Sequence, residues 1–466
     1  MGNCRHNHRG RSRNQQGIRF CIFHLIQTYH GIDPGYGISA KGLTGESYCG
    51  WTWWDTETYC LPFYMFTNVQ AAKNLLLYRY NTLPQAIERA AQLDCTGARY
   101  PMATINGTEA VGTWQHGDLE IHVSVAVAYG IWHYVNITGD KEFLYNQGIE
   151  MLLQISRYYA SRGQWAQKTG DFGFWGVMGP DEFAMMVHNN YYTNAMVKKA
   201  FEYCLSVVDD MKVNAPAQLA LVERKVALAN IEYADWLLKA DKMRLPQDAS
   251  TGIYEQYDGY FNMPRVDPKE IPDEQFPLYK SWAYVRIFRN DMIKQPDVLL
   301  MHLFYSHDYT LENKRANYQF YEARCCHESS LSPGIHAILA SELGMHQQAF
   351  EYVRFASRLD LDNYNNNTHE GIHNTSMAAA WMNIVYGFAG LRTDGDLLSF
   401  KPSIPAQWTG YSFKLKYKEN LVNFKVDHKH MHIKLLSGSR LVLMVFDKQV
   451  EATQKETSVG LNVEQH

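Results

Sequence analysis

The sequence predicts a mainly helical protein that ends in a small β domain, and two observations support this fold class. From about residue 67 to 395, apolar residues recur at spacings of three and four, as on one face of an amphipathic helix. After about residue 396, apolar and polar residues alternate with period two in short runs between turn residues. Many helices followed by a β cap indicate an α/α toroid or a helical bundle with an accessory domain.

The helical part divides into segments with recognisable ends. The predicted helical segments are 68–93, 141–163, 215–240, 332–344 and 345–359. The first reads as two helices, because Pro84 restarts the pattern, and the last two form a pair that breaks at Gly344. We expect residues 1–14 to form a basic, disordered leader, 15–395 the helical catalytic barrel and 396–466 the β domain.

Long loops rich in Gly, Asn, Trp and Tyr separate these helices. They span residues 41–57, 171–194, 250–283 and 360–376. Structureless loops of that length in a compact domain are usually functional. Since a toroid builds its active site from the loops that join successive helices at one mouth, we expect the four loops to meet in space.

The composition of the chain narrows its class. The 466 residues carry a net charge of −4, and no basic cluster interleaved with aromatic residues appears, which argues against a nucleic-acid partner. No apolar run is long enough to span a membrane, and the N-terminus lacks the apolar core of a signal peptide. The eight cysteines form no CxxC pair, so we predict free thiols in a reducing, cytoplasmic compartment.

Two neighbouring carboxylates occupy a turn within "GVMGPDEFAMMVHNNYYTN", at Asp181 and Glu182. Aromatic residues surround them in the sequence, at positions 172, 174, 175 and 183. Glycosidic bond cleavage needs a carboxylic acid that stays protonated near neutral pH, and burial among aromatics or a neighbouring negative charge raises a carboxyl pKa. The alternative is an acidic turn that caps the following helix.

Four further stretches carry polar groups suited to a sugar or an anion. Trp51, Trp53 and Trp54 precede Asp55 and Glu57, which combines a flat apolar wall with hydrogen-bonding carboxylates. The stretches at 290–300, 325–336 and 362–381 place Lys-Gln, or Ser, Thr, His and Gly, ahead of helices, where exposed N–H groups and hydroxyls bind anions. A buried aromatic loop and ordinary helix caps remain the alternatives.

A metal site is not predicted. His428, His430 and His432 alternate along one predicted strand, and no carboxylate or Cys partner is apparent for them, so a solvated strand face is the better interpretation. No GxSxG elbow, Walker-type loop, HExxH motif or dinucleotide fingerprint occurs. Hydride transfer, ATP chemistry and serine hydrolysis therefore have no support in the sequence.

Five motifs taken together resemble glycoside hydrolase family 65. They are "AKGLTGE…WWDTE…LPFY", "GVMGPDEF…NNYYTN", "IKQPDVLL", "HESSLSPGIH" and "NNNTHEGIHNTSMAAAWMNIVYGFAGLR". The resemblance covers roughly residues 15–440, and within the family "QGIRFCIFHLIQTYHGIDP" and "THEGIH" look most like the kojibiose phosphorylase and 2-O-α-glucosylglycerol phosphorylase branch. It implies an (α/α)6 barrel and inverting phosphorolysis of an α-glucoside, which gives β-glucose 1-phosphate.

The resemblance also implies roles for individual residues. Glu182 stands at the position of the general acid. Trp54, Asp55, Lys294 and Gln295 match the positions that contact the glucosyl unit. The positions suggested as phosphate ligands are Ser330, His373, Thr375 and Ser376. Inorganic phosphate is then a co-substrate, and no metal or organic cofactor is implied.

Two alternatives to a phosphorylase remain open from the sequence. An inverting hydrolase needs a second carboxylate to activate water, and Glu370 within the phosphate-binding loop is available for that task. Phosphate is itself a nucleophile, and Lys294, His373 and the hydroxyls favour an anion. Relatives usually carry an N-terminal β-sandwich that contributes to a dimer, and we expect it to be missing here. The second alternative is therefore a truncated, inactive barrel that binds sugars. The assembly that the resemblance implies is a homodimer.

Overall fold

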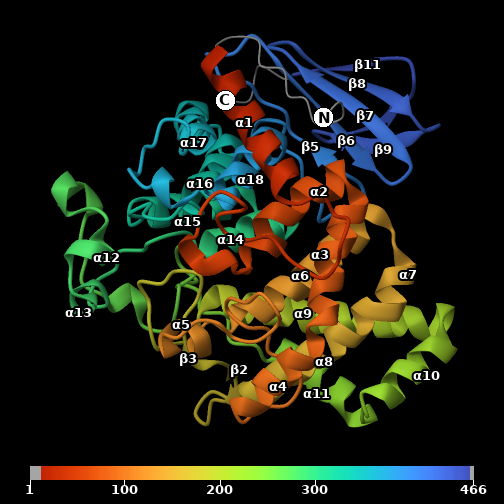
Figure 1. Ribbon diagram of the computed structural model, residues 1–466, viewed down its shortest axis with the longest axis vertical. Helices are drawn as coiled ribbons and strands as arrows, with labels where there is room; N and C mark the ends of the chain where they lie inside the picture. Colours follow the sequence, from red (N-terminus) through yellow and green to blue (C-terminus); the bar gives the residue numbers. More distant parts are fainter. Residues whose placement is uncertain (1–11, 462–466) are drawn as a thin grey trace.

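Paired helices form a closed ring in the computed structural model, which describes residues 12–461 (Figure 1). The inner helices are α2 (Leu61–Thr67), α6 (His122–Thr138), α9 (Tyr191–Asn214), α14 (Val298–Phe304), α16 (Ser332–Glu342) and α18 (Asn374–Met382). Each contacts the next, and α18 contacts α2, so the ring closes. Within the described residues this is the (α/α)6 barrel that the family resemblance implied, and that prediction is confirmed.

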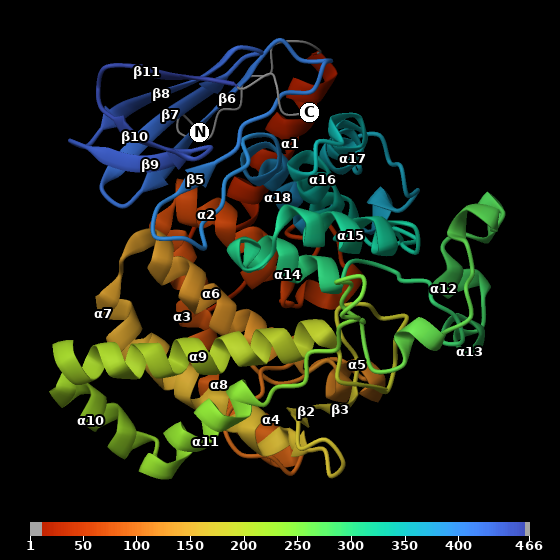
Figure 2. The same ribbon diagram turned by 180° about the vertical axis from the view of Figure 1, so that it is seen from behind.

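An outer layer of helices covers the inner ring. It consists of α1 (Ser12–Thr28), α3 (Val69–Asn81), α8 (Ile149–Arg162), α11 (Asn230–Asp241), α15 (Leu311–Glu322) and α17 (His346–Arg358). α1 contacts α17 and α18, so the first described helix packs against the last two (Figure 2). The segment before Ser12, which belongs to the predicted leader, lies outside the described residues.

Burial explains why these sequences form two layers. Every residue of α18 is buried, which suits a helix enclosed by neighbours on all sides. α17 buries Ala349, Phe350, Val353 and Ala356, a spacing of three and four that leaves its opposite face to solvent. Sequence periodicity therefore detects the outer helices more readily than the inner ones.

Shorter helices complete the ring and its loops. They are α4 (Leu83–Gln92), α5 (Trp114–Leu119), α7 (Lys141–Phe143), α10 (Pro216–Lys225), α12 (Leu278–Ser281) and α13 (Tyr284–Ile287). The breaks predicted at Pro84 and Gly344 are confirmed by the ends of α3 and α16. The single helix predicted over 215–240 is wrong, because the chain turns between α10 and α11, where Ala227 takes a positive φ of 49°.

The C-terminal part folds as two packed sheets, as the alternating pattern predicted. Its strands are β5 (Ser399–Phe400), β6 (Tyr411–Tyr417), β7 (Asn420–Val426), β8 (His430–Ser437), β9 (Leu441–Val445), β10 (Lys448–Ala452) and β11 (Thr457–Gly460). One sheet has the order β11-β8-β7-β6 and the other β10-β9-β5, with β5 parallel to β9. β6 packs on α2, which fixes the β domain against one end of the ring.

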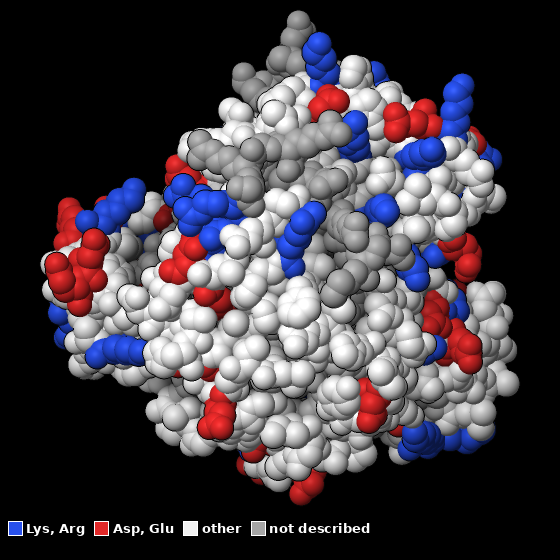
Figure 3. All heavy atoms as spheres, turned by 45° about the horizontal axis from the view of Figure 1, so that its top comes forward, with Lys and Arg blue, Asp and Glu red and all other residues white. Residues whose placement is uncertain are grey.

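The loops that the sequence singled out contain little regular structure. Residues 171–190 hold only the short strands β2 (Phe172–Gly173), β3 (Trp175–Val177) and β4 (Val187–His188), and α9 begins at Tyr191. Strand β1 (Gln164–Trp165) pairs with β2. Acidic and basic side chains are interspersed on the face that Figure 3 shows. Among the described residues, no helix combines the length and the apolar character that a membrane crossing requires. The domain limits at residues 15 and 396 remain predictions.

Candidate active site

An ion pair joins two of the loops at the centre of the candidate site. Glu182 follows the turn after β3, and its Oε2 lies 2.7 Å from Nζ of Lys294, which precedes α14. The Glu182 side chain is 28% exposed, so it remains accessible to a ligand. The Lys294 ammonium also lies 5.4 Å from the ring centre of Tyr279, which brings the 250–283 loop to the same place.

The predicted protonation of Glu182 is wrong for the ligand-free protein. Burial raises the pKa of Glu182, as expected, but Lys294 and His116 together lower it by more, so the net shift is downward. The sequence suggested the aromatic neighbours and missed the opposing ammonium. Glu182 is therefore ionised in this state and acquires a proton only if its ion pair with Lys294 is relaxed.

Two buried carboxyl groups connect the loop that carries Glu182 to the segment that carries Lys294. Asp181 accepts hydrogen bonds from the Lys294 backbone N–H at 2.8 Å and from Gln256 at 2.9 Å. Its own backbone N–H faces Asp297, which accepts from Asn190 Nδ2 at 2.9 Å. Asp181 therefore holds the Lys294 backbone and the Gln256 side chain beside Glu182.

A second group of polar residues gathers where the 41–57 and 360–376 loops meet. His373 receives support from Asp360, whose Oδ1 lies 2.7 Å from Nδ1, and its Nε2 lies 3.0 Å from Nζ of Lys41. Lys41 is only 1% exposed, and burial lowers its pKa, while the charges of Asp360 and Glu370 partly offset that effect. A buried ammonium beside an imidazole at the N-terminus of α18 forms a cationic pocket wall suited to an anion.

Lys41 is the main functional candidate that sequence reasoning missed. It belongs to "AKGLTGE", a motif quoted for the family resemblance without a role for its lysine. Gly42 beside it takes a φ of +58°, and a Cβ at Gly45 would meet the carbonyl oxygen of Glu370 at 2.2 Å. Glycines in the motif thus permit the close approach of the two loops, a signal that was present in the sequence.

Asp55 and Tyr48 connect the two groups. Thr375 donates a hydrogen bond of 2.8 Å to Asp55, and burial raises the pKa of Asp55 to about 6, with a further contribution from the charge of Glu182. Tyr48 has the Lys41 ammonium 5.8 Å from its ring centre and also responds electrostatically to Lys294 and Glu182. The acid and the cationic pocket wall therefore belong to one site.

The remaining predicted residues divide between the site and the core. Gln295 is buried and donates to the Pro180 carbonyl, and its Oε1 is enclosed without a hydrogen-bond partner. Ser330 is half-buried in the turn before α16. Trp54 is 3% exposed and packs against the rings of Tyr59, His122 and Tyr192, which leaves it little surface for a sugar.

The phosphate role suggested for Ser376 does not fit its environment. The Ser376 side chain is buried inside α18, and its hydroxyl donates to the Ala356 carbonyl at 3.2 Å. The family motif places this serine beside the proposed phosphate ligands, but in α18 its side chain points toward α17 and away from Asp55. Thr375 is the residue of the pair that faces Asp55 and the site.

A pair formed by half-buried His116 and buried Glu120 was also missed by the sequence analysis. Nδ1 of His116 lies 2.5 Å from Oε1 of Glu120, immediately before α6. The loop that leads to Glu182 is fastened here, because the Met178 N–H donates to the Leu119 carbonyl at 3.0 Å. Burial raises the pKa of Glu120, and the charge of Glu182 adds to the effect. The pair therefore lies close enough to influence the acid.

Glu370, the base of the hydrolase alternative, lies in the short turn Thr368–Glu370 before Gly371. Its charge raises the pKa values of both Lys41 and Tyr48, so it borders the cationic pocket wall. The histidines of the β domain lie apart from this site. His428 binds the Trp408 carbonyl, whereas His432 has a carboxylate partner, Asp427, at 3.2 Å, which the sequence analysis had not foreseen.

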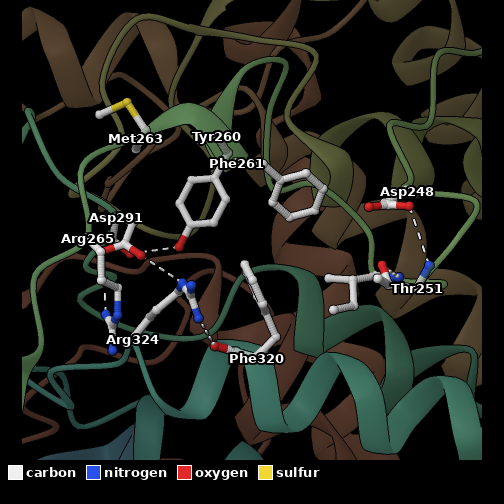
Figure 4. A pocket seen from close by; sticks show the side chains of 10 residues that line it. Asp248, Thr251, Tyr260, Phe261, Met263, Arg265, Asp291, Phe320 and Arg324 are labelled. Atoms are coloured by element: carbon white, nitrogen blue, oxygen red, sulfur yellow. Dashed lines mark hydrogen bonds and ion pairs between the residues drawn. The ribbon is translucent and has the colours of Figure 1, made fainter.

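A separate cavity of about 360 Å³ opens beside the 250–283 loop (Figure 4). Arg324 lies over the Phe320 ring at 3.6 Å, and its Nε is 2.8 Å from Oδ2 of Asp291. Tyr260 donates to the Asp291 carbonyl at 2.7 Å. These contacts anchor the chain just before Lys294, so the cavity wall helps to hold the lysine of the candidate site.

The fold and the site together define an (α/α)6 barrel whose loops bring a carboxyl group, a lysine and a cationic wall together. The chain belongs to glycosyl hydrolase family 65. The model of the family's central catalytic domain matches residues 19–382, and that of its C-terminal domain matches residues 391–452. The recognition made from the five motifs is thereby confirmed.

Known relatives are similar to this chain over nearly all of its length. It is 39% identical over 437 residues to the maltose phosphorylase of Bacillus subtilis (strain 168), covering 94% of this chain and 57% of the relative. It is 39% identical to the α,α-trehalose phosphorylase of Thermoanaerobacter brockii (94% and 56%) and 32% identical to the kojibiose phosphorylase of Halothermothrix orenii (96% and 59%). The chain thus spans less than two thirds of the length of these curated relatives.

A solved structure shares the whole fold. It is described as "Putative kojibiose phosphorylase from human microbiome" and superposes with a TM-score of 0.95 at 45% identity. The match covers 100% of this chain and 68% of that one.

Proposed function

We propose that this protein is an inverting glycoside phosphorylase that cleaves an α-glucoside with inorganic phosphate and releases β-D-glucose 1-phosphate. The observation that carries the proposal is the pairing of one accessible carboxyl group, Glu182, with a separate cationic wall made by Lys41 and His373. A phosphorylase needs an acid for the leaving oxygen and a cradle for an anionic nucleophile, and the site supplies both.

Glu182 is the proposed general acid, and Lys294 controls its proton. In the free protein the ammonium keeps the carboxyl ionised. Glucosyl hydroxyls that bind Lys294 and Gln295 would draw the ammonium away, and the buried carboxyl would then take up a proton. Substrate binding would thus create the acid that the leaving oxygen requires.

Lys41, His373 and the first N–H groups of α18 are the proposed phosphate ligands, with Ser330 and Thr375 at the edge. Asp360 fixes the imidazole by accepting from its Nδ1, and Nε2 then accepts from Lys41, so His373 holds the ammonium that would face the proposed anion. Phosphate bound there would attack the anomeric carbon on the face opposite Glu182, which inverts the configuration. The reaction as proposed requires neither a metal nor an organic cofactor.

Kojibiose is the substrate that we place first. The solved structure that matches the entire chain carries that name in its title, whereas curated relatives of similar identity are named for maltose and trehalose. The acceptor-side loop 250–283, which brings Tyr279 to Lys294, would select among kojibiose, glucosylglycerol and the other disaccharides.

The location and assembly of the protein are also proposals. The seven cysteines within residues 12–461 are free thiols, and free thiols are typical of a reducing compartment such as the cytoplasm. A homodimer is proposed because the family resemblance implies one. Analytical ultracentrifugation of the full chain would test it, and a monomer at assay concentrations would contradict it.

The first prediction tests the activity itself. Glu182→Gln keeps the shape of the acid but has no proton to donate to the leaving oxygen, so we expect turnover to fall by at least about a hundredfold. The assay measures glucose 1-phosphate and glucose from kojibiose, maltose, trehalose and glucosylglycerol, with and without phosphate.

Each outcome of this assay separates the hypotheses. Phosphate-dependent release of glucose 1-phosphate supports the phosphorylase. Equal glucose release without phosphate, lost in Glu370→Gln, would identify the hydrolase with Glu370 as its base. A wild-type chain inactive on all four substrates would favour the sugar-binding barrel, and an undiminished rate in Glu182→Gln would refute the assigned acid.

A further inference from the structure

Three metal-ligating side chains converge behind the candidate active site, where nothing in the proposed reaction uses them. Cys325 and His327 lie in the segment after α15, and His336 lies on α16. One donor atom from each falls within 4.8 Å of the other two. Cys325 and His336 are buried, and His327 is 23% exposed, which gives this cluster a side open to solvent.

The hydrogen bonds of Glu322 orient both imidazoles toward the thiol. Oε2 of Glu322 binds Nδ1 of His336, so that nitrogen carries the proton and Nε2 presents a lone pair. Nε2 of His336 lies in a side chain with 0% exposure and has no hydrogen-bond partner. A buried lone pair without a donor is costly, and a bound cation would satisfy it.

The imidazole of His327 is oriented in the same way, with Tyr352 between it and Glu322. The Tyr352 hydroxyl donates to Oε1 of Glu322, so its oxygen is left to accept from Nε2–H of His327 at 3.1 Å. Nδ1 of His327 then also presents a lone pair, 3.6 Å from Sγ of Cys325 and 2.8 Å from Oγ of Ser332. The far nitrogen of His336 is thus held by a carboxylate and that of His327 by a tyrosine hydroxyl, and metal-binding histidines typically have such outer hydrogen bonds.

We propose that Cys325, His327 and His336 bind one divalent transition-metal ion, with Zn²⁺ as the best match. Zinc–nitrogen and zinc–sulfur bonds of about 2.0–2.3 Å place tetrahedral ligands about 3.3–3.8 Å apart, and the Cys325–His327 separation of 3.6 Å lies in that range. The charges also balance, because a thiolate and the Glu322 carboxylate neutralise a divalent ion. Ser332 or a water molecule takes the fourth position.

A purely hydrogen-bonded polar network is the competing explanation. It accounts for His327 and Ser332, yet it leaves Nε2 of His336 without a partner. The metal site would also brace the active site. Sγ of Cys325 lies 4.0 Å from the Lys294 carbonyl oxygen, and the Glu328 N–H donates to that same oxygen. The ion would therefore fix both Lys294 and the turn that carries Ser330.

Metal binding to the untagged full chain tests the proposal independently of catalysis. After treatment with a chelator, the protein is titrated with Co²⁺ and then with Zn²⁺, and the visible spectrum and metal content are measured. We expect one equivalent of Co²⁺ in a tetrahedral site with a thiolate-to-cobalt charge-transfer band, which Zn²⁺ displaces. We also expect the chelator to lower the melting temperature and Zn²⁺ to restore it.

Matched variants locate the ion. Cys325→Ser is expected to lose the charge-transfer band and to weaken binding at least tenfold, and Glu322→Gln to weaken it by about 10- to 100-fold. Cys326→Ser is the control, because the neighbouring Cys326 contacts Met292 and lies outside this cluster. His430→Ala tests the exposed Asp427–His430–His432 group as a rival site.

Two results would overturn the proposal. One is a wild-type protein that binds neither Co²⁺ nor Zn²⁺. The other is metal binding that survives Cys325→Ser and is lost in His430→Ala. Should Cys325→Ser fail to fold, the wild-type cobalt spectrum still decides, since a band without thiolate character excludes Cys325 as a ligand. Activity enters none of these outcomes, so they are separable from failure of the proposed phosphorylase.

Discussion

The ion pair between Glu182 and Lys294 determines the chemistry of the site at the scale of single residues. The same ammonium that suits a sugar hydroxyl also keeps the proposed acid ionised in the free protein. Burial pushes the carboxyl pKa up and Lys294 pulls it down, so whichever group the lysine contacts decides whether Glu182 holds a proton.

Removing the ammonium should therefore change the pH dependence as well as the rate. In Lys294→Met the main influence that lowers the pKa of Glu182 disappears while burial remains, so that pKa rises. The pH above which kcat/KM falls, which reports loss of the Glu182 proton in the free protein, should therefore move upward from its low wild-type value. The overall rate should drop because a glucosyl contact is lost. A pH–rate profile measures both.

Lys269→Met provides the control for this prediction, because Lys269 is exposed in the 250–283 loop. Its profile should match the wild type. If the pH at which kcat/KM falls does not move in Lys294→Met, Glu182 is not the group whose ionisation the profile reports.

A buried carboxyl should make the protein less stable as the pH rises. Burial, reinforced by the charge of Asp181, raises the pKa of Asp297 from 3.8 to about 8. Between about pH 4 and pH 8 the folded protein keeps a proton that the unfolded chain has released, so the free energy of unfolding falls with a slope of up to about 1.4 kcal/mol per pH unit.

Asp297→Asn removes this titration, so its unfolding free energy should vary less with pH than that of the wild type. Denaturant unfolding at several values between about pH 5 and pH 9 measures the slope for both proteins. Parallel slopes would show that Asp297 stays ionised in the folded state.

The sequence motifs identified some of the residues at the site, whereas the side chains of other motif residues are buried in the core. Glu182, Lys294 and His373 stand in motifs, and the structure brings the loops that carry them together. Trp54 and Ser376 come from the same motifs yet face the core, because adjacent positions on a short helical segment point to different sides. Lys41 and the His116–Glu120 pair were missed, since their significance comes from partners distant in the sequence.

At the scale of elements, the 41–57 and 360–376 loops form the cationic wall together, and their backbones lie in close contact at Gly45 and Glu370. The Ile372 N–H donates to the Thr44 hydroxyl at 2.9 Å, and Lys41 Nζ contacts the Gly371 carbonyl at 3.2 Å. Gly45 permits this approach because it has no side chain. The geometry of the wall therefore depends on a glycine that contacts no ligand.

Gly45→Ala should separate the two loops. The added methyl group would meet the Glu370 carbonyl oxygen at 2.2 Å, which forces the backbone to shift. We expect the KM for phosphate to rise by about tenfold or more, because a misplaced lysine and histidine each lose part of a charged hydrogen bond. Initial rates at varied phosphate measure the effect.

Gly112→Ala is the matched substitution, since a Cβ at Gly112 meets nothing within 4 Å. It should leave the KM for phosphate unchanged. If Gly45→Ala behaves in the same way, the packing of these two loops does not position the phosphate site.

Periodicity predicted mainly outer helices, whose two faces differ, and the segment 332–344 was its one match to an inner helix, α16. The breaks at Pro84 and Gly344 were readable, because proline and glycine end helices for local reasons. The turn between α10 and α11 carries Val226, Ala227 and Leu228, none of which signals a break. At this turn the packing of α10 and α11 determines the break, although the apolar periodicity of the sequence continues through it.

At the scale of the whole molecule, the β domain is joined to the ring through an apolar contact. Trp408 is 1% exposed and packs against Phe350 of α17 at 5.8 Å and Phe388, just after α18, at 5.0 Å between ring centres. We expect the ring and the β domain to unfold together, because separation would expose these rings.

Trp408→Ala should lower the free energy of unfolding by about 3–5 kcal/mol, the usual effect of removing a buried aromatic side chain. Guanidinium unfolding followed by far-UV circular dichroism measures it. A wild-type protein with two separate transitions, or a variant as stable as the wild type, would contradict the joined arrangement.

The closure of the ring has a consequence for the order in which the chain acquires its structure. α1 is held by groups far along the sequence: Sγ of Cys21 contacts the Ser357 carbonyl, a separation of 336 residues, and Arg358 donates to the Arg13 carbonyl. On the ribosome, α1 emerges long before α17 and α18 exist, so its apolar face has no lasting partner during most of synthesis. The last helices of the ring to be synthesised, α17 and α18, are thus the ones that secure α1.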